Sequence, residues 1–256
     1  MIHSTAIIDP TATIAKDVEI GPYSVIGANV SIGEGTVIAS HVTINGTTTI
    51  GKNNRIYQFS SIGEDPQDKK YAGEVSYLEI GDNNIIREFT TIHRGTIQDK
   101  NITCIGDNNL LMAYAHVAHD CVIANDVILA NAASLGGHVH IGSFVILGGF
   151  SIVHQFCQLG EYSFSAMGSA ITKDVPPYVM VGGRPTQPHG INTVGLERRG
   201  FSKETMLQVK RAYKVLYKSG LKLTEATSRL TEMAEHTPEL KTIISFLQAS
   251  NRSILR

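Results

Sequence analysis

The sequence predicts a mostly β protein, in which a parallel β-helix over residues 1–184 is followed by a C-terminal α-helical domain over residues 185–256. Isoleucine occurs at every sixth position from Ile2 to Ile62, eleven times without a miss. A period of six fits neither a helix, which repeats about every 3.6 residues, nor a simple alternating strand. It is the hexapeptide signature of a parallel β-helix. The C-terminal part loses this period and carries helix signals instead.

The hexads divide into two registers. The first line of apolar residues breaks after Ile62 and returns over residues 80–92. A second line, one residue out of step, covers residues 105–159, misses at Ser165 and resumes at Ile171. Each short strand is expected to point one residue inward before the chain turns a corner, and an irregular coil is expected at the miss. Glycine and small polar residues suit corners because they tolerate unusual backbone angles.

Two insertions interrupt the hexads. The first covers residues 64–74 and has Asp68 and Lys70 near its centre, and the second lies near residues 98–103. Insertions in a repeat protein emerge as loops on one face, often the binding face. A solvated loop and a substrate-contacting loop both remain open for each. Between them, the pair His93-Arg94 is consistent with a structural role or with binding an anion.

The hexads resemble those of the left-handed β-helix family, in which three hexads form one triangular coil. The resemblance implies that residues one coil apart stack at about 4.8 Å, the strand spacing of a sheet. On this basis five polar residues gather along one edge of the prism over three successive coils. They are His116, His119, His138, His154 and Gln155.

This cluster contains four of the chain's ten histidines. A single histidine at a corner is expected to be a solvated residue, but four together favour a binding or catalytic site. Asp120 directly follows His119 and is a candidate for orienting its imidazole. Neighbours in a strand point to opposite faces, however, so an indirect or cross-subunit role for Asp120 is equally expected.

The tail predicts three helices. Prolines over residues 176–188 indicate a linker in which helix is disfavoured. Ser202 is expected to cap a helix that ends near Ser219. A second helix is expected from Thr224 and a third near Pro238, since proline suits a first turn.

The first of these helices carries a basic strip. It comprises Lys210, Arg211 and Lys214 and continues to Lys218, and positions 210, 214 and 218 lie four apart on one helical face. Such a strip is usually a solvated surface. The alternative is a docking site for an acidic protein that is steered by charge.

Composition argues against several classes of protein. The net charge is −1, whereas nucleic-acid-binding proteins usually carry a strongly basic face. Cys104, Cys121 and Cys157 form no C-x-x-C pair, which predicts a reduced, cytoplasmic protein. The start has no basic segment followed by an apolar core, and no run approaches the roughly 20 apolar residues of a membrane span.

Several motifs are similar to those of the UDP-N-acetylglucosamine O-acyltransferase family, which catalyses the first step of lipid A biosynthesis. They are "Q-D-K-K-Y-A-G-E", "T-I-H-R-G-T", "A-H-V-A-H-D-C", "V-H-Q-F-C", "D-V-P-P-Y" and "G-L-E-R-R-G-F-S". The resemblance implies transfer of a 3-hydroxyacyl group from acyl carrier protein to the 3-hydroxyl of UDP-N-acetylglucosamine. It further implies a homotrimer with sites between subunits, no metal, and no cofactor besides the phosphopantetheine thioester of the carrier protein.

The resemblance also implies roles for single residues. His119 is the general base, a role that suits a side chain titrating near neutral pH, and the backbone N–H of Gly137 stabilises the oxyanion. Lys210, Arg211 and Lys214 bind the carrier protein. The substrate-binding positions are Asp68, Lys70, His116, His138, His154, Gln155, Asn192, Arg198 and Arg199. One departure is Val194, where the family commonly has an acidic residue.

Met167 matches the position that limits acyl-chain length in the family. A methionine there implies a shorter 3-hydroxyacyl group than a glycine would. The alternative is that Met167 only fills a gap in the core, as methionine often does.

Two rival functions remain at this stage. The first is a zinc hydratase of the β-helix carbonic anhydrase type, which also groups histidines between subunits. Those histidines are typically spaced H-x4-H, whereas His116 and His119 are spaced H-x2-H. The second rival is a non-catalytic solenoid that serves as a binding scaffold.

Overall fold

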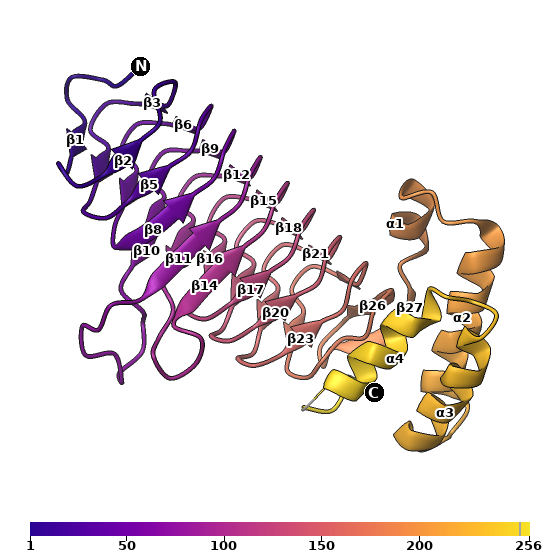
Figure 1. Cartoon of the computed structure of the whole chain (residues 1–256). Coiled ribbons are helices and arrows are strands. Elements are labelled where there is room, and N and C mark those ends of the chain that lie inside the picture. The colour runs from indigo at the N-terminus through magenta and orange to yellow at the C-terminus, as the bar shows by residue number, and fades with distance from the viewer. Residues whose placement is uncertain (251) are drawn as a thin grey trace.

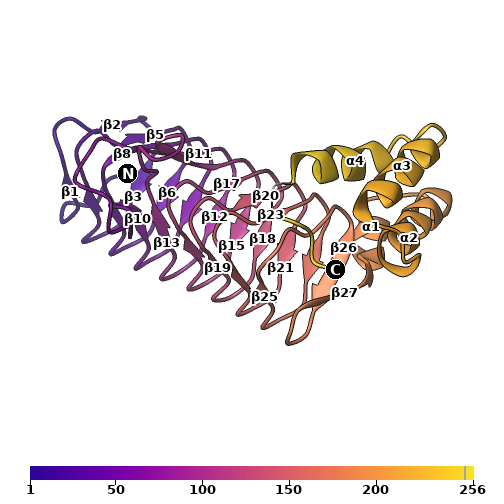
Figure 2. The ribbon, with the colours of Figure 1, turned by 90° about the horizontal axis from the view of Figure 1, so that it is seen from below.

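In the computed structural model, short parallel strands wind into a triangular prism that ends in a group of helices (Figure 1). The structure describes residues 1–250 and 252–256. The N-terminus lies at one end of the prism and the helices at the other (Figure 2). Within the described residues, no helix is both long and apolar enough to cross a membrane.

Each turn of the chain adds one strand to each of three faces. Face 1 contains β1 (Ile7–Ile8), β4 (Val25–Ile26), β7 (Thr43–Ile44), β10 (Ser61–Glu64), β13 (Thr91–His93), β16 (His116–Val117), β19 (Ser134–Leu135), β22 (Ile152–Val153) and β25 (Ala170–Ile171). Face 2 contains β2 (Thr13–Ile14), β5 (Ser31–Ile32), β8 (Thr47–Ile50), β11 (Tyr77–Ile80), β14 (Ile102–Ile105), β17 (Val122–Ile123), β20 (His140–Ile141) and β23 (Gln158–Leu159). Face 3 contains β3 (Glu19–Ile20), β6 (Val37–Ile38), β9 (Arg55–Ile56), β12 (Ile85–Ile86), β15 (Leu110–Leu111), β18 (Ile128–Leu129), β21 (Ile146–Leu147), β24 (Phe164–Ser165), β26 (Val179–Gly182) and β27 (Gln187–Ile191).

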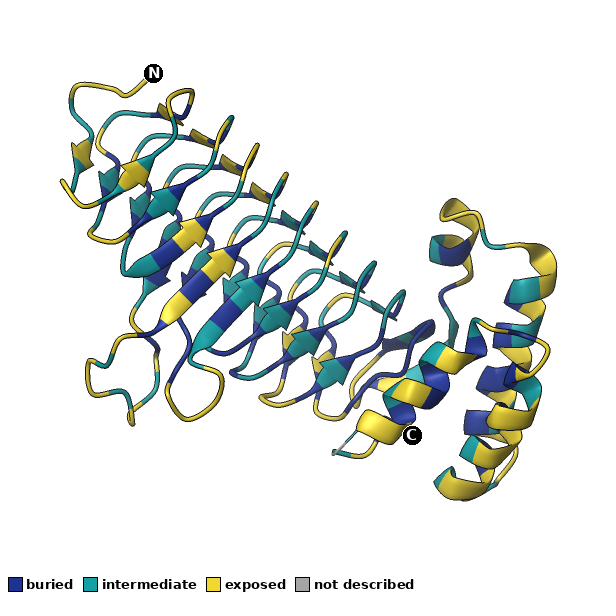
Figure 3. Ribbon diagram, viewed as in Figure 1, coloured by how far each residue is buried: buried dark blue, intermediate teal, exposed yellow. Residues whose placement is uncertain are grey.

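Strand register confirms the stacking predicted from the hexads. Val117 pairs with Leu135, three hexads later, and Leu135 pairs with Val153 after three hexads more. The predicted line of apolar residues forms the inside of the prism, where each of these three side chains is at most 1% exposed (Figure 3). A period of six therefore follows from three strands per coil with one inward residue per strand.

The two insertions account for the change of register. Ser61 of β10 pairs backwards with Thr43, at the regular three hexads, but forwards with Thr91, so the first loop adds two whole hexads to its coil. Ile80 of β11 pairs with Ile105 of β14, and the second loop therefore adds one hexad and one further residue. The first loop preserves the six-residue line, and the second causes the slip between the two lines.

The glycines have a different role from the predicted one. Most corners with positive φ are occupied by larger residues, such as Phe59 (φ 64°) and Tyr114 (φ 64°). Gly33 lies beside a neighbouring coil, where an added Cβ would sit 2.7 Å from the Gly51 carbonyl carbon. Close approach of stacked backbones, rather than backbone angle, thus selects glycine at such positions.

The irregular coil predicted at Ser165 is observed on its C-terminal side only. Ser165 pairs with Leu147 at the regular distance of three hexads, but it pairs with Val181 on the other side, so the following coil is two residues short. Its side chain is buried and is hydrogen-bonded to the Ser151 hydroxyl at 2.8 Å. Because a second buried hydroxyl satisfies it, serine is accommodated inside the prism in place of an apolar residue.

The C-terminal helices largely follow the prediction. They are α1 (Thr193–Arg198), α2 (Lys203–Lys218), α3 (Leu223–Ala234) and α4 (Leu240–Ala249). Ser202 caps α2 by accepting from the Thr205 N–H, as predicted. The short helix α1 was not anticipated after the proline-rich segment, and β26 and β27 form a hairpin across the expected linker. The domain boundary at residue 184 remains a prediction.

We predict that the two residues of β17 differ sharply in their effect on stability. Ile123→Ala removes a side chain that is 2% exposed inside the prism, and such changes cost about 2–5 kcal/mol. Val122→Ala, its outward-facing neighbour, is the matched control and should cost less than about 1 kcal/mol. Urea unfolding of both variants measures the difference, and equal losses would contradict the inward–outward assignment.

Candidate active site

Corners between face 1 and face 2 form an edge that we call the histidine edge. His119, Gly137 and Gln155 are corner residues one coil apart and lie in one column. Backbone hydrogen bonds join the coils at this edge, since the N–H of His138 donates to the His119 carbonyl at 3.0 Å. The sequence-predicted cluster is thus brought together, with His116 on the adjoining strand β16.

His119 and Asp120 form a hydrogen-bonded pair. The Nδ1 atom of His119 lies 2.9 Å from Oδ2 of Asp120, whose side chain is 1% exposed. The expectation that the two side chains point to opposite faces is wrong. Asp120 has φ 59°, and the alternation of an extended strand does not hold at such a corner.

The second insertion loop, which covers residues 94–101 between β13 and β14 in the structure, completes the surroundings of Asp120. Thr96 donates to this carboxylate twice, from its backbone N–H at 2.8 Å and from its hydroxyl at 2.6 Å. Burial raises the pKa of Asp120, but the hydrogen bonds from His119 and Thr96 outweigh it, and the net pKa is lowered. The ionised carboxylate can only accept, so the imidazole proton lies on Nδ1 and leaves Nε2 free to take a proton.

Gly137 lies directly against the imidazole of His119. An added Cβ at this glycine would be 2.6 Å from Cε1 of His119 and 2.8 Å from Nε2. Within the described residues, its backbone N–H has no hydrogen-bond partner. A free N–H beside the basic nitrogen is the arrangement that stabilisation of an oxyanion requires.

The other histidines of the cluster have separate partners. His138 contacts Asp99 of the second loop through Nδ1 at 2.8 Å and packs edge-on against the His119 ring. His116 contacts the Thr91 hydroxyl at 2.7 Å, and burial lowers its pKa to about 4, so it is neutral near pH 7. His154 lies 3.3 Å from the guanidinium of Arg252.

Both insertion loops emerge from the histidine edge, as predicted for loops of one face (Figure 1). The first loop carries Asp68, whose carboxylate accepts from the backbone N–H of Lys70 at 3.0 Å, and Lys70 itself is exposed. These two residues lie at the correct edge, but no hydrogen bond joins them to the histidines in the part of the chain that the structure describes.

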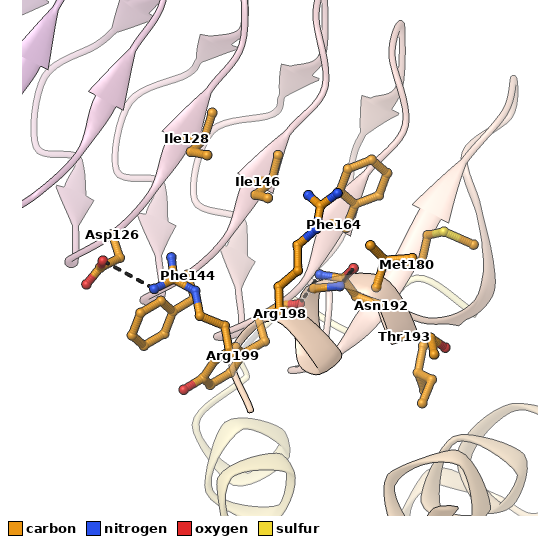
Figure 4. A pocket seen from close by; sticks show the side chains of 14 residues that line it. Asp126, Ile128, Phe144, Ile146, Phe164, Met180, Asn192, Thr193, Arg198 and Arg199 are labelled. Carbon is orange, nitrogen blue, oxygen red and sulfur yellow. Dashed lines mark hydrogen bonds and ion pairs between the residues drawn. The ribbon is translucent and has the colours of Figure 1, made fainter. Parts of the chain in front are cut away.

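A second group of predicted residues lies elsewhere, at the edge between faces 2 and 3. A groove of ≈ 720 Å³ is lined there by Asn192, Arg198 and Arg199, and Figure 4 shows their side chains. Arg199 stacks on the Phe144 ring at 4.4 Å and lies 3.6 Å from the carboxylate of Asp126. We call this groove the arginine groove.

Sequence reasoning missed three residues of the arginine groove. Asp126, Phe144 and Tyr162 line it and follow one another on successive coils, three hexads apart. The stacking rule that grouped the histidines also groups this column, so the signal was present. Val194, the departure from the family pattern, lines the same groove and is exposed.

The remaining predicted residues lie outside both sites. Met167 is 81% exposed at the third edge, so the alternative that it fills the core is wrong. It lines a smaller cavity together with Phe150 and Arg184. The basic strip, Lys210, Arg211 and Lys214, is exposed on α2.

Spacing alone also permits a metal at the histidine edge. Ligand atoms of His119, Asp120 and His138 lie within 4.8 Å of one another. Only two histidines take part, however, and the Nδ1 atom of each already contacts a carboxylate. The geometry thus supports a histidine–aspartate acid–base pair at least as well as a metal site.

The repeats and the histidine edge define a transferase of the hexapeptide class. Residues 1–33, 11–46 and 105–137 match the family described as bacterial transferase hexapeptide, and residues 174–255 match the second domain of UDP-N-acetylglucosamine O-acyltransferase. Relatives named acyl-[acyl-carrier-protein]–UDP-N-acetylglucosamine O-acyltransferase include those of Thiobacillus denitrificans (52% identity) and Pseudomonas fluorescens (55%). Each alignment covers 100% of this chain and 99% of the relative.

Solved structures agree with these matches. The UDP-N-acetylglucosamine O-acyltransferase of Moraxella catarrhalis shares 50% identity, with a TM-score of 0.98 over 100% of this chain and 99% of the other. The UDP-N-acetylglucosamine acyltransferase of Francisella novicida shares 48% identity, with a TM-score of 0.98 over 100% of this chain and 94% of the other. The chain belongs to the UDP-N-acetylglucosamine O-acyltransferase family. The left-handed β-helix is confirmed, and neither the zinc hydratase nor the non-catalytic scaffold is supported.

We predict that Gly137→Ala inactivates the protein while leaving its fold intact. The new methyl group would lie 2.6 Å from Cε1 of His119, so the imidazole must move away from the free N–H. Turnover should fall at least about 10²-fold, the loss expected when one oxyanion donor or one acid–base group is misplaced. Steady-state assays combined with thermal unfolding test this, and near-normal turnover would exclude close apposition of the two groups.

Proposed function

We propose that this protein transfers a 3-hydroxyacyl group from acyl carrier protein to the 3-hydroxyl of UDP-N-acetylglucosamine, the first step of lipid A biosynthesis. Full-length identity of 52% and 55% to relatives of that name supports the substrates. The observation that carries the mechanism is the His119–Asp120 pair beside the free N–H of Gly137. The free cysteines Cys104, Cys121 and Cys157 suit the cytoplasm, where the carrier protein would be met.

The proposed reaction is direct acyl transfer. The Nε2 atom of His119 takes the proton of the sugar 3-hydroxyl as its oxygen attacks the thioester carbonyl carbon. The N–H of Gly137 donates to the oxyanion of the tetrahedral intermediate. The carbon–sulfur bond then breaks, and the departing thiolate takes the proton back from His119. Asp120 keeps the imidazole oriented and stabilises its charged form.

The positions of the charged and polar side chains suggest which part of UDP-N-acetylglucosamine each of them binds. In this proposal Asp68 and Lys70 contact the glucosamine and its neighbouring phosphate, while His116, His138, His154 and Gln155 line the cleft. Asn192, Arg198 and Arg199 bind the nucleotide, because guanidinium groups match phosphate oxygens. The histidine edge and the arginine groove belong to different edges of one prism, so a single chain cannot bring them around one substrate.

A homotrimer resolves this separation. Parallel copies around a threefold axis would place the histidine edge of one subunit against the arginine groove of the next. Face 3 supports this proposal, since its outward side is apolar towards the C-terminal end of the prism. Ile128, Ile146, Phe164 and Met180 line that surface. Parallel sheets usually have such faces covered.

We predict that His119→Ala folds normally but loses about 10²–10⁴ in turnover, the usual contribution of a positioned base. Thiol release from the acyl carrier protein thioester measures the rate. His236→Ala, an exposed histidine of the helical domain, is the control and should keep full activity. Near wild-type turnover in His119→Ala would remove this residue from the mechanism.

A second prediction concerns acyl-chain length. Met167 projects from the third edge, where it would block the end of an acyl groove. Each additional buried CH₂ is worth about 0.8 kcal/mol. Space for several of them therefore discriminates strongly between long and short acyl chains. Met167→Gly should shift the preference to longer donors when thioesters of different length compete. An unchanged ranking would show that the groove does not end at Met167.

A third prediction concerns the carrier protein. Replacing Lys210, Arg211 and Lys214 by glutamate should lower the apparent affinity for the acidic carrier protein at low salt. Binding of UDP-N-acetylglucosamine should stay unchanged. The difference should shrink as salt rises, because exposed charges are screened beyond about 10 Å at 0.1 M. If the variant and the wild type have the same apparent affinity for the carrier protein at low salt, this docking surface is excluded.

A further inference from the structure

We infer that Arg94 is a positioning residue that holds the first insertion loop in place for the acceptor sugar. In the structure this loop joins β10 to β11 and covers residues 65–76. The inference rests on the proposed function in one respect, namely that Asp68 and Lys70 contact the acceptor. Arg94 itself touches no predicted substrate position in the described residues. Its effect must therefore pass through the loop.

The guanidinium of Arg94 joins the solenoid to the loop. The side chain is 9% exposed. It donates to the carbonyl of Gly63, at the end of β10, and to the carboxylate of Asp65. A further N–H donates to the hydroxyl of Tyr71 at 3.1 Å. One buried cation thus binds both the start of the loop and its middle.

The solenoid is shaped to admit this side chain. At Gly46, two coils before Arg94, an added Cβ would overlap the Arg94 guanidinium and lie 2.6 Å from its Cδ. Gly46 also has φ 63°, so both space and backbone favour glycine. Arginine is suited to this position because its planar fork serves acceptors in several directions, whereas a lysine presents a point charge.

Contacts within the loop close the network. The Tyr71 hydroxyl lies 3.1 Å from the Glu74 carbonyl and 3.2 Å from the Asp65 carboxylate. His93, next to Arg94, contacts the Asp65 carbonyl through Nδ1. Asp65 is therefore held from three sides, although its side chain is 68% exposed.

Asp68 and Lys70 depend on this anchor. Between Asp65 and Tyr71 the chain is mostly exposed, and its hydrogen bonds within the described residues are those of a local turn, in which Asp68 accepts from the N–H groups of Lys70 and Tyr71. If the anchor were lost, substrate binding would have to order the loop, at a cost in backbone conformational entropy. Loss of Arg94 should accordingly weaken acceptor binding more than it slows the chemical step.

The experiment uses the full-length protein with Arg94→Met, Arg94→Lys and Tyr71→Phe. The last removes one loop contact without touching the solenoid interior. Arg87→Met is the matched control, since the Arg87 side chain lies on a neighbouring coil and, in the described residues, contacts Glu88 and the Tyr57 ring rather than the loop. Two quantities are measured: KM for UDP-N-acetylglucosamine against KM for the carrier thioester, and the rate of tryptic cleavage after Lys69 and Lys70.

Arg94→Met should raise KM for UDP-N-acetylglucosamine about tenfold or more, the loss expected for hydrogen bonds to a charged group. KM for the carrier thioester should stay within about twofold of wild type. Tryptic cleavage of the loop should become several-fold faster. Arg94→Lys and Tyr71→Phe should give intermediate values, and Arg87→Met should match wild type.

The two measurements separate the possible failures. Wild-type cleavage rates in all three variants would overturn the inference, because the loop would not depend on Arg94. Faster cleavage with an unchanged KM for UDP-N-acetylglucosamine would instead overturn the assignment of Asp68 and Lys70 to the acceptor, and with it the functional half of the inference. Equal increases of both KM values would reduce Arg94 to a residue needed for general stability.

Discussion

The hydrogen bonding of each coil to the next is the constraint on which the rest of the structure depends. Because Val117, Leu135 and Val153 must stack inside the prism on successive coils, every corner residue is also placed over the one before it. His119 therefore lies beside Gly137 without any loop having to bring them together. A site built on stacked corners is rigid, and rigid placement of a base and a donor is what acid–base catalysis needs.

Much of this could be read from the sequence, because a six-residue period translates directly into spatial neighbours. The inward line, the histidine column and the two loops follow from counting. The contact of Asp120 with His119 could not be counted, since it depends on a corner with positive φ. The same holds for the hydrogen bonds of Thr96 and Arg94, which come from inserted segments whose paths the repeat does not specify. The column that begins at Asp126 also follows from the spacing of the hexads, but it contains no histidine, so its residue types provided no chemical reason to select it.

The inserted segments supply what a regular solenoid lacks. A repeating coil presents the same geometry at every level, so specificity must come from departures. The segment 93–96 reaches in two directions: Arg94 anchors the first loop, and Thr96 holds the carboxylate that orients His119. One short stretch thus connects the proposed acceptor-binding loop to the proposed base. This arrangement requires a buried cation, which is tolerated because three acceptors surround it.

The central claim is that catalysis requires two edges from different copies of the chain, and mixing subunits tests it most directly. His119→Ala lacks the base, and the double variant Arg198→Ala, Arg199→Ala lacks the groove cations. A mixed trimer of these two inactive chains contains one site with both halves intact, so it should recover about one third of wild-type turnover. Tagged trimers of mixed composition, isolated after co-expression, provide the measurement. Mixed trimers no more active than either parent would contradict a site shared between neighbouring subunits.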